Sequence, residues 1–188
     1  MSDVSIVKVG GSLYDLPDLG ARLTRWLHTH ATGPVLLVPG GGAATDVIRA
    51  HDLTHQLGAE ASHWLALHML QVNAHLLERL LPKAAVVTSY HSTAPLAILD
   101  PLSFARLDES SPDALPHTWD VTSDSLALRV AQAAQAHELV LLKSVTWDGA
   151  DWGAAARAGV VDAHFPQLWR KSPTVRASVV NLRIWTNA

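Results

Sequence analysis

Two lysines and one aspartate stand at positions from which their side chains could act on a phosphoryl group. Lys8 lies in a short apolar run, 4–9, that leads directly into paired glycines. Lys143 ends a second apolar run, 138–142, and Asp124 falls in the first turn of a predicted helix. Ammonium groups neutralise phosphate oxygens, and a carboxylate between two of them can orient both. These residue types therefore predict phosphoryl transfer, which needs charge neutralisation and alignment more than covalent help.

Glycine-rich turns follow two of the predicted strands, 4–9 and 35–38. Glycine lets the backbone approach a ligand closely and exposes consecutive N–H groups, which suits an anion. The second turn also opens a helix, whose N-terminus favours negative charge. We therefore expect a phosphate cradle. Its residues are Gly10, Gly11 and Ser12 in the first turn and Gly40, Gly41 and Gly42 in the second.

Each of these features also has an ordinary structural explanation, which the sequence leaves open. A lysine at the end of a strand can simply be exposed to solvent. Thr122 or Ser123, followed by Asp124, makes a good helix N-cap without any further function. Neither a Walker A sequence nor a kinase catalytic-loop motif occurs, so a P-loop NTPase is excluded.

The order of the predicted elements indicates an α/β fold. A strand, a glycine turn and a helix follow one another twice within residues 4–51, which is typical of a sheet with parallel strands. Because the carboxyl ends of parallel strands share one edge, we expect the site at that edge. The predicted strands are 4–9, 35–38, 85–88, 138–142 and 175–180, and the predicted helices are 18–30, 43–51, 60–81, one starting at 123, and short pieces after 153 and around 165–169.

Length and composition fit one domain, 1–188. Of its residues 48% are hydrophobic and 16% charged, enough for a sizeable core. The net charge is −3 and no basic run occurs, which argues against nucleic acid or a membrane surface as a partner. The chain shows no leader-like start and no apolar run of about 18 residues, so we expect a cytoplasmic protein.

Two stretches bear on how the site is covered and how subunits assemble. The segment 89–118 is rich in proline and serine but too apolar for a disordered linker, so we expect a lid or rim segment there. The helix predicted over 60–81 is long enough to span the domain or to contact another subunit. We therefore expect a homo-oligomer.

Packing explains most of the eleven histidines and seven tryptophans. His51 and His55 lie four residues apart, but no carboxylate partner completes a recognised zinc site. We therefore expect no metal site built by the protein. The tryptophans lack the basic groove that a base-stacking surface would need. Trp119 and Trp147 are exceptions, because they flank the motifs and either could close over a ring.

Four strings resemble, in this order, the motifs of the amino acid kinase superfamily. The resemblance implies a three-layer αβα sandwich with a mainly parallel sheet that binds ATP at its carboxyl edge. It also implies that Lys8 and Lys143 contact the transferring phosphoryl group, that Asp124 organises them, and that Mg²⁺ arrives with the nucleotide. The strings are 7–13 (Val-Lys-Val-Gly-Gly-Ser-Leu), 38–42 (Val-Pro-Gly-Gly-Gly), 121–127 (Val-Thr-Ser-Asp-Ser-Leu-Ala) and 142–149 (Leu-Lys-Ser-Val-Thr-Trp-Asp-Gly).

The nucleotide side departs from the family pattern. After Gly149 the chain lacks the usual Tyr-x-x-Asp-Pro ending of the nucleotide loop and has Ala-Asp-Trp over 150–152 instead. A degenerate nucleotide pocket would suit a protein that binds its ligand without turnover. The residues expected to contact the nucleotide are Gly10, Gly11, Ser12, Ser123, Thr146, Trp147, Asp148 and Gly149.

Within the superfamily, strings at 39–49, 62–68 and 119–124 are similar to the branch that makes the furan part of methanofuran-type carriers. The similarity implies transfer from ATP to an aminomethylfuran phosphate, a small molecule with an ammonium at one end and a phosphate at the other. Glycine N–H groups suit the phosphate, and an acid or aromatic ring suits the ammonium. The expected acceptor residues are Gly40, Gly41, Gly42, Asp46, His63, Trp119 and Thr122, with Glu60 and Trp64 as further candidates for the ammonium.

The sequence thus predicts an ATP-dependent small-molecule kinase. Two alternatives stay open. The acceptor could be another small phosphate or a carboxylate. The chain could instead be a non-catalytic protein that binds a nucleotide or an oxyanion on the same fold.

Overall fold

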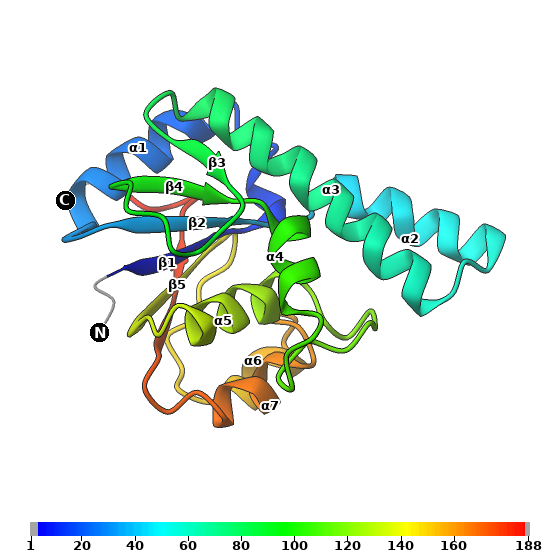
Figure 1. The fold of residues 1–188 in the computed structure, drawn as a ribbon. Coiled ribbons are helices and arrows are strands. Elements are labelled where there is room, and N and C mark those ends of the chain that lie inside the picture. Colours follow the sequence, from blue (N-terminus) through cyan, green and yellow to red (C-terminus); the bar gives the residue numbers. More distant parts are fainter. Residues whose placement is uncertain (1–3, 187–188) are drawn as a thin grey trace.

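Six parallel strands form the central sheet in the computed structural model, which describes residues 4–186 (Figure 1). The order across the sheet is β3-β4-β2-β1-β5-β6. This arrangement confirms the predicted α/β fold. The strands are β1 (Ser5–Val9), β2 (Val35–Pro39), β3 (Ala85–Val87), β4 (Leu96–Leu99), β5 (Glu138–Lys143) and β6 (Arg176–Asn181).

Helices cover both faces of the sheet and make a three-layer sandwich (Figure 1). One face packs against α1 and the C-terminal half of α3, and the other packs against α4, α5, α6 and α7. No helix within residues 4–186 is long and apolar enough to cross a bilayer. The helices are η1 (Gly11–Leu13), α1 (Leu19–His30), α2 (Ala43–His55), α3 (Ala59–Leu80), α4 (Pro101–Asp108), α5 (Ser123–Ala133), α6 (Trp152–Arg157) and α7 (Phe165–Arg170).

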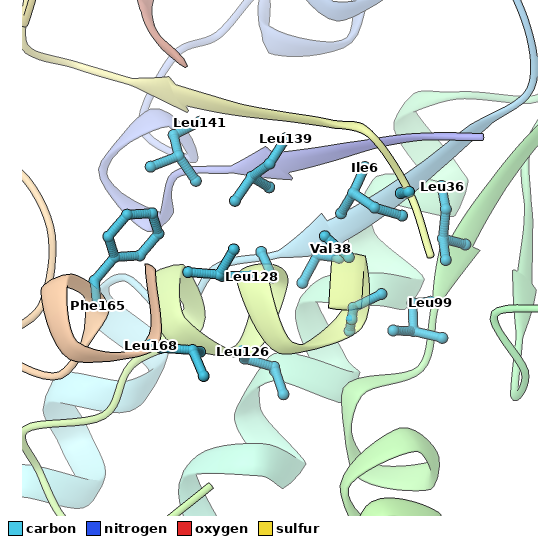
Figure 2. Packing of buried hydrophobic residues seen from close by; sticks show 14 of the residues in the cluster. Ile6, Leu36, Val38, Leu99, Leu126, Leu128, Leu139, Leu141, Phe165 and Leu168 are labelled. Atoms are coloured by element: carbon cyan, nitrogen blue, oxygen red, sulfur yellow. The ribbon is translucent and has the colours of Figure 1, made fainter. Parts of the chain in front are cut away.

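The central strands are apolar on both sides because both faces are covered. In β1, Ile6 points into the layer that holds α5, whereas Val7 joins the layer that holds α1. Figure 2 shows the first of these layers, in which Phe165 of α7 and Leu128 of α5 pack below the strands. Lys8 interrupts this apolar pattern, and its side chain is nevertheless buried.

The chain leaves β1 and β5 toward opposite faces of the sheet. The turn after β1 leads to α1 on one face, and the loop after β5 leads to α6 and α7 on the other. Because β1 and β5 are neighbours in the sheet, their carboxyl ends form a switch point, where open α/β sheets usually bind ligands.

The prediction of a lid or rim over 89–118 is wrong for its middle part. That part holds β4, which pairs with both β2 and β3 inside the sheet, and α4, which packs on the core. The strand was missed because its short apolar run is flanked by prolines. Pro101 in fact begins α4, where Asp100 accepts hydrogen bonds from the first free N–H groups. Beyond α4, residues 109–122 form an irregular segment beside the site.

Candidate functional site: a carboxylate bridging two lysines

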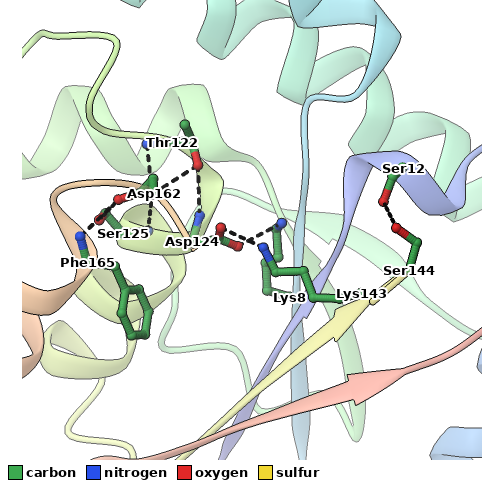
Figure 3. Close-up of polar contacts among 9 residues, drawn as sticks. All are labelled: Lys8, Ser12, Thr122, Asp124, Ser125, Lys143, Ser144, Asp162 and Phe165. Atoms are coloured by element: carbon green, nitrogen blue, oxygen red, sulfur yellow. Dashed lines mark hydrogen bonds and ion pairs between the residues drawn. The ribbon is translucent and has the colours of Figure 1, made fainter. Parts of the chain in front are cut away.

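Asp124 bridges Lys8 and Lys143 at the carboxyl edge of the sheet (Figure 3). Its Oδ1 atom lies 2.8 Å from Lys8 Nζ, and Lys143 Nζ donates to its Oδ2 atom at 2.6 Å. Lys8 is 3% and Asp124 4% exposed, so the charges are held away from water. Two ammonium groups and one carboxylate leave one net positive charge. The structure therefore brings together the three residues that the sequence singled out.

The environment of this cluster alters two pKa values. Burial by itself would raise the pKa of Asp124, but the charges of Lys8 and Lys143 outweigh it and hold that pKa below its usual value. Burial, reinforced by the neighbouring Lys8, lowers the pKa of Lys143 to about 8. Asp124 is thus ionised at neutral pH, and the pKa of Lys143 lies close to neutral pH.

The N-terminus of α5 positions Asp124. Thr122 is the N-cap, and its hydroxyl accepts from the Asp124 N–H at 3.5 Å. Asp162 holds the cap from outside the helix. It accepts from the N–H and the hydroxyl of Thr122, from the N–H and the hydroxyl of Ser125, and from the N–H of Phe165 (Figure 3). The loop before α7 therefore fixes the helix end that carries Asp124.

The two glycine turns touch through their backbones. A Cβ added to Gly11 would lie 2.1 Å from the nitrogen of Gly42, and one added to Gly42 would lie 2.4 Å from the oxygen of Gly11. Gly42 also has a φ of +57°, a backbone conformation that residues with a side chain rarely adopt. Behind the second turn, Asn73 of α3 donates to the carbonyls of Gly40 and Gly41, both at 2.7 Å. The turns thus require glycine and are held in place from α3.

Several N–H groups in the turns have no hydrogen-bond partner within residues 4–186: those of Gly11, Ser12, Gly41 and Gly42. The N–H groups of Gly10 and Gly40, by contrast, donate to strand carbonyls. Unpaired donors of this kind suit an anion. The Ser12 hydroxyl reaches Ser144 at 2.8 Å and so joins the first turn to the loop after β5 (Figure 3).

A cavity of about 300 Å³ opens beside the lysines. Its charged end holds the lysine pair and the glycine turns, and apolar side chains of α3, α5 and the segment 109–122 form a wall. The lining includes thirteen of the eighteen residues predicted for the site. They are Lys8, Gly10, Gly11, Ser12, Gly41, Gly42, Asp46, His63, Trp119, Thr122, Ser123, Asp124 and Lys143.

Other predicted residues lie elsewhere. Gly40 belongs to the second turn but does not line the cavity, and its backbone groups pair with Val9 and Asn73. The predicted nucleotide loop follows β5 and does not line this cavity. In that loop, Thr146 accepts from the side chain of Asn181, and Trp147 packs on the core beside Gly149. The assignment of Thr146, Trp147, Asp148 and Gly149 to a nucleotide stays a prediction.

Glu60 and Trp64 do not line the cavity either. The Glu60 carboxylate accepts from Trp64 Nε1 at 2.6 Å and lies 2.5 Å from His117 Nδ1. Both residues are engaged with each other and with His117, which leaves Asp46 and His63 as the ammonium candidates that reach the cavity.

Three residues in and around the site were missed from the sequence. The guanidinium of Arg49 lies 4.2 Å from the ring centroid of Trp119, and Arg49 forms no ion pair within residues 4–186. Helical spacing could have found it, since it lies three residues after Asp46. Asn73 could have been noticed as an amide on the apolar face of a long helix. The role of Asp162 at the N-terminus of α5 could not be predicted, because its partners Thr122 and Ser125 are distant in sequence.

The described residues, 4–186, contain no group of histidines and carboxylates arranged to hold a metal ion. The carboxylate of Asp124 is already occupied by two ammonium groups. The donor set of the cavity therefore suits an anion rather than a bare cation.

The chain belongs to the amino acid kinase family, a family of phosphotransferases, and residues 3–146 match its model. A curated relative is the [5-(aminomethyl)furan-3-yl]methyl phosphate kinase of Methanocaldococcus jannaschii, which is 27% identical over 150 residues. The match covers 74% of this chain, which spans 65% of that relative's length.

Solved uridylate kinases share the fold. The enzyme of Archaeoglobus fulgidus superposes with a TM-score of 0.67 at 13% identity, covering 95% of this chain and 90% of that one. The UMP kinase of Bacillus anthracis gives 0.63 at 13% identity, covering 96% and 88%. At this level of identity the likeness establishes the three-layer architecture.

Proposed function

We propose that this protein transfers the γ-phosphoryl group of ATP to a small phosphate acceptor. The observation that carries the proposal is the pair Lys8 and Lys143, bridged by Asp124 beside unpaired glycine N–H groups. Phosphoryl transfer spreads negative charge over oxygens that such cations and donors stabilise. The lysines would bind the migrating group, and the glycine turns would align donor and acceptor.

The state of Asp124 favours an acceptor that is already ionised. Both of its oxygens contact ammonium groups, and its pKa is held below the usual value by the lysine charges despite burial. A carboxylate in this state is a poor general base. A phosphate oxyanion needs no base, whereas an alcohol would. The geometry thus supports a phosphate or carboxylate acceptor.

We propose [5-(aminomethyl)furan-3-yl]methyl phosphate as that acceptor, converted to its diphosphate in methanofuran-type biosynthesis. A cavity of about 300 Å³ suits a molecule of this size, and its apolar wall suits a ring. The name of the Methanocaldococcus relative supports the same choice. Mg²⁺ would be held by the nucleotide phosphates, which it often binds with few protein ligands. Cytoplasmic location and homo-oligomerisation stay predictions.

Release of ADP from Mg-ATP, measured with and without this acceptor, tests the proposal. Release that depends on the acceptor supports both the kinase activity and the acceptor. Release only with another phosphate or a carboxylate would overturn the acceptor and keep the kinase. No release with any of them, although ATP binds in calorimetry, would favour the non-catalytic alternative. The placement of Thr146, Trp147, Asp148 and Gly149 away from the cavity favours that alternative.

A further inference from the structure

His63 and His117 form a stacked pair at the edge of the cavity. Their ring centroids are 3.8 Å apart and their planes differ by 13°. His63 belongs to the N-terminal part of α3, which lies away from the sheet (Figure 1), and it lines the cavity. His117 belongs to the segment 109–122 and is partly buried. The pair therefore joins α3 to the segment that walls the cavity.

The partners of His117 define its charge. Its Nδ1 atom lies 2.5 Å from Glu60 Oε2, and its Nε2 atom lies 3.2 Å from Glu109 Oε2. An ionised carboxylate only accepts hydrogen bonds, so both ring nitrogens must donate, which requires an imidazolium. Although burial opposes it, these two carboxylates raise the pKa of His117. His117 is thus a cation braced between two acids.

A cation stacked on His63 opposes a second positive charge there. Burial and then the charge of His117 lower the pKa of His63 to about 4. Glu60 and Glu109 act in the opposite direction but are engaged by His117. A neutral imidazole has one N–H and one lone pair, and His63 makes no hydrogen bond with another residue in 4–186. Other charged groups on the surrounding elements include Asp108, which is paired with Arg129, Asp52 of α2, which accepts from Trp119, and Arg106 of α4. The charged residues that line the cavity are Asp46, Arg49, Lys8, Lys143 and Asp124.

We infer that His63 is a specificity-determining residue that selects acceptors carrying an amine, and that His117 keeps it neutral for this purpose. A neutral imidazole accepts a hydrogen bond from an ammonium, whereas a protonated one would repel it. The inference rests on the proposed function, because it requires an acceptor in the cavity. His117, braced by Glu60 and Glu109, acts through His63 and is a positioning residue.

The protonation of His63 can be tested without any substrate. Histidine side chains labelled with ¹⁵N report their pKa by NMR in the wild type and in His117→Phe, which keeps an aromatic ring but removes the charge. We expect His63 to titrate well below an ordinary histidine in the wild type. In His117→Phe its pKa should rise part of the way toward 6.5. An ordinary titration in the wild type, or no change in the variant, would overturn the role of His117.

Selectivity is tested with two probes, the aminomethylfuran phosphate and the same furan phosphate without its aminomethyl group. In His63→Leu the preference for the amine, taken as a ratio of kcat/KM, should fall roughly tenfold. His68→Leu is the matched control, since His68 is exposed on the same helix and should keep the preference. In His117→Phe the preference should weaken at pH 6 and persist at pH 8. An unchanged preference in His63→Leu would overturn the inference.

If neither probe is phosphorylated, the preference is measured instead as the ratio of the two Kd values, by calorimetry. Equal affinity of the wild type for both probes would then overturn the selectivity. The NMR result would stand independently, so a failure of the kinase proposal can be told apart from a failure of this inference.

Discussion

Asp162 accepts hydrogen bonds from both the N–H and the hydroxyl of Thr122, at 3.0 and 2.9 Å. Thr122 caps the helix whose first turn carries Asp124, the carboxylate between the lysines. A residue outside the cavity lining thus holds the end of α5 in place. The position of Asp124 between the two lysines depends on this contact between a helix cap and a loop 40 residues later in the chain.

Replacing Asp162 with Asn should lower both stability and turnover. The amide accepts fewer hydrogen bonds and places donors against Thr122 and Ser125, so we expect a loss of about 1–3 kcal/mol in the free energy of unfolding. Turnover should fall because Asp124 shifts relative to the lysines. Urea unfolding and kcat are the measurements. Asp120→Asn is the control, because Asp120 is exposed and should leave both values unchanged. Wild-type kcat in a destabilised Asp162→Asn variant would contradict the positioning role.

Lys8→Met removes one ammonium from the cluster while filling similar space. We expect kcat to fall by about 100-fold or more, because one charge that stabilises the transferring phosphoryl group is lost. Asp124 keeps Lys143 as a partner, so the fold should persist, as circular dichroism can verify. Lys83→Met provides the comparison, since Lys83 is exposed. Substantial activity in a folded Lys8→Met protein would remove Lys8 from the mechanism.

The sequence predicted the proximity of the three candidate residues better than it predicted the details of the fold. Lys8, Lys143 and Asp124 could be placed together because strand ends and a helix start meet at the carboxyl edge of a parallel sheet. Short, buried strands carry little signal of their own, since an apolar run has no period that separates strand from helix. For that reason the sequence does not distinguish β4, between its two prolines, from a lid segment.

The long-range partners of the site could not be predicted from the sequence for a different reason. Asn73 supports Gly40 and Gly41 from a helix more than 30 residues away, and Asp162 caps α5 from a loop beyond the next strand. The amide of Asn73 on the apolar face of α3 indicates a buried partner but not which one. Only the packing of α3 and the path of the loop before α7 bring Asn73 and Asp162 to the site.

Asn73→Ala tests the support of the second glycine turn. The variant leaves the buried carbonyls of Gly40 and Gly41 without their side-chain donor, which should cost about 1–3 kcal/mol in the free energy of unfolding. Because the turn then moves more freely, we expect a higher KM for the phosphate acceptor and a smaller change in kcat. Val72→Ala, at an exposed position of the same helix, should behave as the wild type. An unchanged KM in Asn73→Ala would show that the turn holds its shape without the Asn73 amide.

The pKa of Lys143, lowered to about 8 by burial and by Lys8, should appear in the pH profile. The ammonium form is needed to neutralise the phosphoryl group, so kcat/KM, which reports the free enzyme, should fall as pH rises through about 8. The contribution of Lys143 to the free energy of unfolding should change in the opposite direction to kcat/KM and increase with pH. Because the folded-state pKa lies below the ordinary 10.5, the unfolded chain binds the proton more tightly between the two values, and this residue makes the free energy of unfolding rise with pH there. Lys143→Arg keeps its charge throughout this range and should lose the alkaline decline even if its absolute rate is lower. A decline near pH 8 that persists in Lys143→Arg would assign the titration to another group.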